Sequence, residues 1–211
     1  MKKRCFIVLF STLMYTSSLY AQSPLPNKQI QLSGGYSRHG SGDLNGIIFG
    51  TEFVKYKSKK FSMSYNLRAT INDGQETIIV NDLISGIRTD NSIHFTTAGV
   101  QVGADAGYSL LRNMRHEVKL TLGAFGRYQS ASPPAGYALY MPNRTNVPAV
   151  LVEFLNFSDQ PRRTMAFGGV FQLQYNYTFK QNLGFGISSG FQTDTNGDAL
   201  PFAMLQLGKR F

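Results

Sequence analysis

The chain has 211 residues, of which 21 are lysine or arginine and 12 are aspartate or glutamate, and its formal net charge is +9. The single cysteine, Cys5, excludes a disulfide framework, a cysteine metal site and a cysteine nucleophile from the rest of the chain. The basic surplus is scattered along the sequence, which argues against a nucleic-acid-binding surface.

The first 21 residues have the three parts of a secretory signal peptide. Residues 2–4 are basic, residues 5–14 form an apolar core, and small residues lead up to Ala21. This core of about ten residues is too short for a membrane-spanning helix, which needs about twenty. We therefore expect export with cleavage after Ala21, and one domain formed by residues 22–211.

From residue 28 onwards, apolar side chains alternate with small or polar ones, as in strands with two different faces. The longest run, 165–179, places Phe167, Phe171 and Leu173 on one face and Gln172 on the other. Its length of about fifteen residues suits a tilted strand crossing a bilayer, where about ten residues span the hydrocarbon. The alternation predicts eight strands, at residues 28–38, 44–56, 60–71, 94–110, 116–128, 165–179, 183–193 and 199–211.

The connections between these strands alternate in length. Residues 57–59, 111–115 and 180–182 form tight turns, whereas the other connections are 39–43, 72–92, 129–163 and 194–198. Short periplasmic turns, longer outer loops and an even strand number are typical of outer-membrane barrels. The sequence therefore predicts an all-β fold, an eight-stranded antiparallel up-and-down transmembrane β-barrel with two long outer loops. A soluble barrel around an apolar cavity would show the same alternation turned inside out, but the leader and the loop asymmetry favour the membrane.

The eight two-faced segments and the last strand, 199–211, resemble the small eight-stranded outer-membrane proteins of the OmpA-transmembrane-domain and OmpX type. In that family a C-terminal aromatic residue is read by the barrel-assembly machinery. The resemblance therefore implies that Leu205, Leu207 and Phe211 form an assembly signal, although Lys209 interrupts its apolar series. We expect a monomer in the cell outer membrane, in contact with outer-membrane lipid and lipopolysaccharide.

The inward faces of the predicted strands carry charged and amide side chains. Eight strands enclose a space that side chains can fill, and an unpaired charge in it would be costly. Asp105 and Lys119 lie near the same inner turn, with Arg68 on the neighbouring strand. We therefore expect a paired polar network that plugs the barrel, and a small porin-like channel is the alternative. The network residues are Glu52, Arg68, Gln101, Asp105, Lys119, Arg127, Gln172 and Gln174.

One constellation resembles a catalytic site. His39, Ser41 and the later Glu52 loosely resemble the residues of outer-membrane lipid A deacylases, in which a histidine base activates a serine. The alternation points Glu52 inward and toward the periplasmic half, far from a histidine in an outer loop. We therefore expect no enzyme, with a lipid A-modifying deacylase as an alternative. His94 and His116 lie near opposite ends of the barrel, so we expect no metal site, and we expect no cofactor.

The two long loops are unusually apolar for segments exposed to water, and exposed apolar patches mark interaction sites. We therefore expect the function to be non-enzymatic: the loops act in adhesion, in binding an unknown surface partner, or in envelope integrity. The candidate residues are Ile78, Ile79, Val80, Leu83, Ile84, Val150, Leu151, Val152, Phe154, Leu155 and Phe157.

Overall fold

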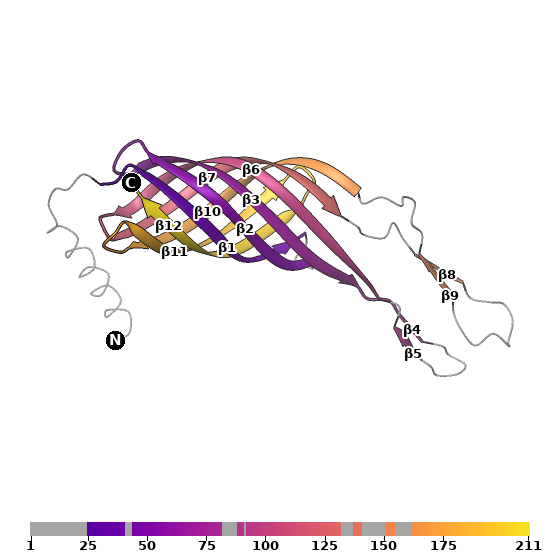
Figure 1. Cartoon of the computed structure of the whole chain (residues 1–211). Coiled ribbons are helices and arrows are strands. Elements are labelled where there is room, and N and C mark those ends of the chain that lie inside the picture. The colour runs from indigo at the N-terminus through magenta and orange to yellow at the C-terminus, as the bar shows by residue number, and fades with distance from the viewer. Residues whose placement is uncertain are drawn as a thin grey trace, which may run out of the picture.

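The computed structural model describes residues 25–40, 44–81, 88–90, 92–131, 137–140, 151–154 and 162–211, so the predicted signal peptide lies outside the described residues. Eight antiparallel strands form a closed barrel (Figure 1), which confirms the predicted fold. No helix among the described residues is long and apolar enough to cross a membrane. The barrel strands are β1 (Lys28–His39), β2 (Leu44–Tyr56), β3 (Phe61–Glu76), β6 (Ile93–Arg112), β7 (His116–Ala131), β10 (Arg162–Thr178), β11 (Leu183–Asp194) and β12 (Ala199–Arg210).

The chain winds around the barrel as an up-and-down meander. Each barrel strand pairs with the barrel strands before and after it in the sequence, and β1 closes the sheet by pairing with both β2 and β12. Lys28 and Phe211 exchange two backbone hydrogen bonds of 2.9 Å at this seam. Closure leaves no unpaired sheet edge along the wall, which is the condition for a sheet to stand in lipid.

The two faces of the wall have opposite chemistry. Leu122 and Phe167 on the outer face are 67% and 66% exposed, whereas Lys119 and Gln172 on the inner face are 0% exposed. A soluble barrel around an apolar cavity would bury the first pair and expose the second. The soluble alternative is therefore wrong, and the apolar belt is a surface for lipid.

Four neighbouring strands are longer than the sequence predicted. We expected long loops at 72–92 and 129–163, but β3 and β6 remain paired as far as Glu76 and Ile93, and β7 and β10 as far as Ala131 and Arg162. An Asp-Gly pair is typical of turns, but Asp73 and Gly74 lie within β3. A Cβ on Gly74 would stand 2.0 Å from the Leu44 side chain, so this glycine permits a close contact and does not mark a turn.

Two small hairpins lie beyond this long side of the barrel (Figure 1). The first pairs β4 (Ile79–Asn81) with β5 (Arg88–Asp90), and the second pairs β8 (Tyr137–Tyr140) with β9 (Leu151–Phe154). We call the ends of β3, β6, β7 and β10, together with these hairpins, the outer rim. The opposite, inner end has tight turns, in which Lys57 N donates to Phe61 O at 2.9 Å and Phe179 N to Leu183 O at 2.7 Å.

Candidate functional site

The lumen of the barrel is filled in successive layers. At the inner end, Glu117 Oε2 accepts hydrogen bonds from Arg210 Nη2 at 2.9 Å and from Tyr56 Oη at 2.8 Å. Its Oε1 accepts from Ser109 Oγ at 2.9 Å and lies 3.8 Å from Arg112 Nε. The Arg112 guanidinium carbon stands 3.4 Å from the centre of the Tyr56 ring. One buried carboxylate therefore holds two arginines together across the lumen.

The next layer contains an ion pair between strands that are not neighbours. Lys119 Nζ on β7 lies 3.6 Å from Glu52 Oε1 on β2, and both side chains are buried. Gln174 Nε2 donates to Glu52 Oε2 at 3.2 Å. Because β7 and β2 stand on different parts of the wall, this pair crosses the lumen and fills it.

A second ion pair lies in the same region. Arg68 Nη2 is 3.9 Å from Asp105 Oδ2 and donates to Gln172 Oε1 at 2.9 Å. Asn66 Nδ2 donates to Asp105 Oδ2 at 2.8 Å. The sequence placed Asp105 and Lys119 near the same inner turn, but these two side chains do not pair with each other. Lys119 forms an ion pair with Glu52, and Asp105 forms one with Arg68.

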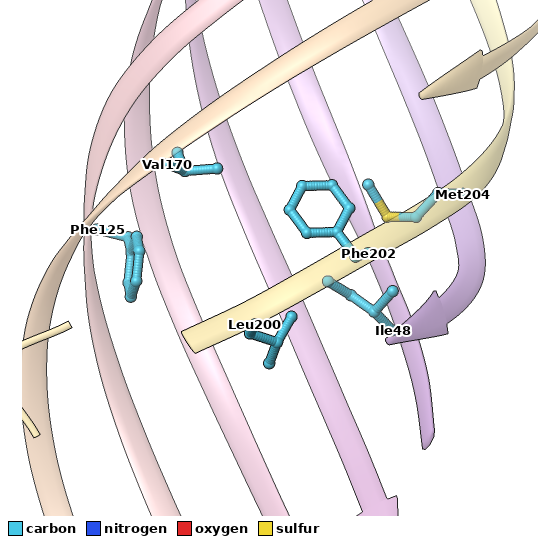
Figure 2. Close-up of a cluster of buried hydrophobic side chains, with 6 residues drawn as sticks. All are labelled: Ile48, Phe125, Val170, Leu200, Phe202 and Met204. Carbon is cyan, nitrogen blue, oxygen red and sulfur yellow. The ribbon is translucent and has the colours of Figure 1, made fainter. Parts of the chain in front are cut away.

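An apolar layer follows toward the outer end and interrupts the polar filling (Figure 2). We expected only a polar plug, so this layer corrects that expectation. The guanidinium carbons of Arg68 and Arg127 lie 5.5 Å and 5.4 Å from the ring centres of Phe202 and Phe125, which is within the range of cation–π attraction. The layer is made of Ile48, Phe125, Val170, Leu200, Phe202 and Met204.

The outer mouth of the lumen carries the last polar layer. Arg127 Nη1 donates to Asp194 Oδ2 at 3.1 Å, and its Nη2 donates to Gln101 Oε1 at 3.4 Å. Gln101 and Gln192 exchange amide hydrogen bonds of 3.0 and 3.2 Å. Side chains from three strands, β6, β7 and β11, are therefore hydrogen-bonded to one another across the mouth.

The charges within the described lumen balance. Five cations face five carboxylates, and every cation has a carboxylate within 4.0 Å. All eight side chains that the sequence pointed inward are buried, and Lys119, Gln172 and Gln174 have no exposed surface at all. The cations are Arg68, Arg112, Lys119, Arg127 and Arg210, and the carboxylates are Glu52, Asp105, Glu117, Asp194 and Asp198.

This filling leads to a prediction about ion flow. Purified protein in a planar lipid bilayer is expected to show no regular single-channel steps, because Lys119 and its neighbours leave no water-accessible surface in the middle of the lumen. The measurement is current at fixed voltage, with a known porin as a positive control. Uniform, reproducible conductance steps from this protein would show that the lumen opens and would contradict the packed interior.

The two described members of the possible catalytic set, His39 and Glu52, do not come together. His39 ends β1 as a buried side chain and is not an exposed loop residue, which corrects the sequence interpretation. Its Nε2 lies 3.1 Å from Gln129 Oε1 and 3.4 Å from Asp198 Oδ2. Glu52 is engaged with Lys119 deeper in the lumen, and Ser41 lies outside the described residues. Asp198, which the sequence could not place, is therefore the carboxylate beside the histidine.

The residues of the outer loops are only partly described. Ile78 is buried and Ile79 is exposed, while Val80 lies in β4 and Leu151, Val152 and Phe154 lie in β9. Leu83, Ile84, Val150, Leu155 and Phe157 lie outside the described residues. Within the described ranges, no group of three or more His, Cys, Asp or Glu residues is arranged to hold a metal ion.

Comparison with solved structures identifies the fold. One similar structure is that of Ail, the attachment invasion locus protein of Yersinia pestis, in complex with the heparin analogue sucrose octasulfate. It superimposes with a TM-score of 0.53 and 13% sequence identity, and the match covers 89% of this chain and 100% of that chain. Neisserial surface protein A gives a TM-score of 0.52 and 8% identity, over 87% and 97%. No protein-family model matches the chain, and the comparison with curated proteins gave no match either. The chain therefore has the fold of the small eight-stranded outer-membrane β-barrels, as the sequence predicted.

Proposed function

We propose that this protein is an integral outer-membrane barrel that presents its outer rim to a partner at the cell surface and performs no catalysis. The observation that carries the proposal is the unequal length of the strands. β3, β6, β7 and β10 contain 16, 20, 16 and 17 residues, whereas β1, β2, β11 and β12 contain 12 or 13. About ten residues suffice to cross the hydrocarbon, so the long strands exceed what membrane spanning requires.

The excess length lies at the outer end. Phe61 at the start of β3 pairs with Tyr108 of β6, and His116 at the start of β7 pairs with Tyr177 of β10, so the strands are aligned near the inner turns. At the other end the four strands continue past His39, the last residue of β1, and Leu44, the first residue of β2. A barrel needs only short turns to close, and long connections that exceed this need are often functional.

The β4–β5 hairpin of the rim has its own local order. Asp90 Oδ1 accepts hydrogen bonds from the side chain and the backbone N–H of Ser92, and these bonds hold the pKa of Asp90 below its usual value. Ile78 is buried behind this hairpin and its N–H donates to Ser92 Oγ at 3.2 Å. Because of these contacts, we propose that the β4–β5 hairpin is an ordered binding surface for a partner and not an unstructured linker.

The sulfated ligand seen with Ail does not carry over to this chain on charge grounds. The described outer end carries exposed Arg38, Arg88, Arg162 and Arg163, but Asp73, Asp90 and Asp198 lie among them, so the described surface has mixed charge and is not uniformly positive. We therefore propose a partner held by apolar and backbone contacts, in which pairing with strand ends is one available mode.

A non-enzymatic role is supported by the arrangement around His39. Its described partners are an amide and a carboxylate, Gln129 and Asp198, and no described serine is hydrogen-bonded to it. A catalytic triad needs the nucleophile and the base within hydrogen-bonding reach of each other. Lipid A from cells that overproduce the protein should accordingly keep all its acyl chains.

The test removes the two hairpins of the outer rim and keeps the barrel strands. Glu76 pairs with Ile93, and Ala131 pairs with Arg162, so residues 77–92 and 132–161 can each be replaced by a two-residue Asn-Gly turn. We expect cells that produce the parent to aggregate and to adhere to immobilised extracellular polymers. Cells that produce the doubly trimmed protein should do neither, although that protein should insert normally. The readouts are gel mobility before and after boiling, which reports folding, and adherence of whole cells.

Two singly trimmed variants serve as matched controls, because each keeps one hairpin and the same barrel. Loss of adherence in only one of them would assign the partner to that hairpin. Undiminished adherence in the doubly trimmed variant, with normal folding, would show that the hairpins are not needed for binding and would contradict the proposal.

A further inference from the structure

Three lysines gather on the lipid-facing wall near the inner end of the barrel. Lys28 on β1 stands directly opposite Lys55 on β2, and Lys209 on β12 pairs with Ile30, the next outward-facing residue after Lys28. All three lysines are exposed. Directly opposed residues on one face have Cβ atoms about 5 Å apart, and diagonal neighbours about 7–8 Å. We call Lys28, Lys55 and Lys209 the lysine row.

No side-chain carboxylate of the described residues lies beside the lysine row. The other described cations at the inner turns, such as Lys57, Lys59 and Lys180, are exposed as well. Among the described side-chain carboxylates, Glu52, Asp105 and Glu117 are buried in the lumen, and the others lie at the outer end. Like charges directly opposite each other destabilise a sheet, so an anion bound from outside the protein would stabilise the lysine row.

A hollow lies on the same wall, farther from the inner end. It has a volume of about 460 Å³, and its lining is almost entirely apolar. It forms where small residues of β1, β11 and β12 stand among larger ones of β10, β11 and β12. The small residues are Gly34, Ser189 and Ala203, and the larger ones include Leu173, Ile187 and Leu205.

The hollow and the lysine row are joined by continuous strands. Lys28 and Gly34 are six residues apart on β1, and Lys209 and Ala203 are six residues apart on β12. Six residues span about 20 Å along a strand, or about 14 Å of depth at a 45° tilt. That depth is about half of the 30 Å hydrocarbon core, which is the thickness of one leaflet.

We propose that this wall binds one anionic phospholipid of the inner leaflet, a site that rests on the proposed membrane residence and is independent of the outer rim. Lys28, Lys55 and Lys209 hold the phosphate-bearing headgroup, and one acyl chain extends past Ile30 and Leu32 into the hollow. The three positive charges favour an anionic headgroup over a zwitterionic one, because a zwitterionic headgroup carries no net negative charge. The hollow, which is lined by small side chains, favours acyl chains that are long enough to reach it.

The test measures lipid retention on the purified, folded protein by native mass spectrometry, with dipalmitoyl phosphatidylglycerol and dipalmitoyl phosphatidylcholine as probes. The parent is expected to retain one phosphatidylglycerol in preference to phosphatidylcholine. The triple variant Lys28→Gln, Lys55→Gln, Lys209→Gln is expected to bind phosphatidylglycerol at least tenfold more weakly, since each basic residue near anionic lipid contributes about fivefold. The matched control is Lys57→Gln, Lys59→Gln, Lys180→Gln, which removes the same charge from the inner turns and should change retention by less than threefold.

The hollow is tested separately by filling it. A Cβ on Gly34 would meet no atom within 4 Å, so Gly34→Leu fills the hollow without a backbone clash. The control, Gly169→Leu, adds the same side chain on β10 outside the hollow, where the nearest atom to a new Cβ is 3.8 Å away. Gly34→Leu should weaken retention of the sixteen-carbon lipid several-fold and leave that of an eight-carbon phosphatidylglycerol unchanged, whereas Gly169→Leu should leave both unchanged.

Equal losses from the two lysine triples would show general charge attraction and overturn the site. Equal retention of the two headgroups by the parent, or a preference for added lipopolysaccharide that the lysine row controls, would overturn the choice of lipid. Lipid retention is measured on isolated protein, whereas adherence is measured on whole cells. The lipid site can therefore be refuted while the role of the outer rim is upheld, and the role of the outer rim can be refuted while the lipid site is upheld.

Discussion

Replacing Glu117 with alanine is expected to destabilise the folded barrel by about 3–5 kcal/mol, the range measured when one partner of a buried ion pair is removed. Glu117 is fully buried and is the carboxylate that both Arg112 and Arg210 approach. Its loss leaves two buried guanidinium groups without a counter-charge. Ser109 loses its hydrogen-bond acceptor, and Tyr56 keeps only Gln29 Oε1 as an acceptor. The measurement is urea unfolding of the protein in lipid vesicles, followed by gel mobility.

Tyr56→Phe is the matched control, because it removes the hydroxyl that lies within hydrogen-bonding distance of Glu117 and Gln29 and leaves the ion pairs in place. It should cost about 1 kcal/mol. If Glu117→Ala unfolds at the same urea concentration as the parent, the inner charge cluster does not stabilise the fold in the way its geometry indicates.

Replacing Phe202 with alanine is expected to destabilise the barrel by about 3–5 kcal/mol, the range found for large-to-small changes in packed cores. Phe202 belongs to the apolar layer in the lumen (Figure 2), where it is 3% exposed. The guanidinium carbon of Arg68 lies 5.5 Å from the centre of its ring. The measurement is again urea unfolding in vesicles. Phe202→Leu is the control and should cost less, because it refills most of the volume. Equal stability of Phe202→Ala and the parent would show that the apolar layer is not tightly packed.

The sequence was sufficient to predict the strands because the period of two is a local property. The residues Gln101, Gln172 and Gln174 were placed inward by parity alone, and the structure buries all three. The same parity places Phe125 and Phe202 inward, so the apolar layer could have been found by following the alternation without assuming a polar lumen. The assumption of a polar lumen, and not the alternation of the strands, therefore led to the incorrect expectation of a purely polar plug.

The ion pairs could not be predicted in this way. Lys119 and Glu52 lie on β7 and β2, which are not adjacent, and they meet only because the closed wall curves. Their distance depends on the barrel diameter and on the stagger between strands, neither of which a single sequence reveals. The meeting of His39 with Asp198 has the same origin, since residues at opposite ends of the chain come together when β1 closes onto β12.

The orientation and membrane residence of the barrel are tested most directly by thiol labelling of whole cells. The only cysteine of the chain is Cys5, in the predicted leader, so single cysteines can be introduced at Asp90 in the outer rim and at Lys59 in an inner turn, both exposed. A membrane-impermeant maleimide is expected to label Asp90→Cys on intact cells, and to label Lys59→Cys only after the outer membrane is permeabilised. Labelling of Lys59→Cys on intact cells with protection of Asp90→Cys, or recovery of both variants as soluble periplasmic protein, would contradict the account.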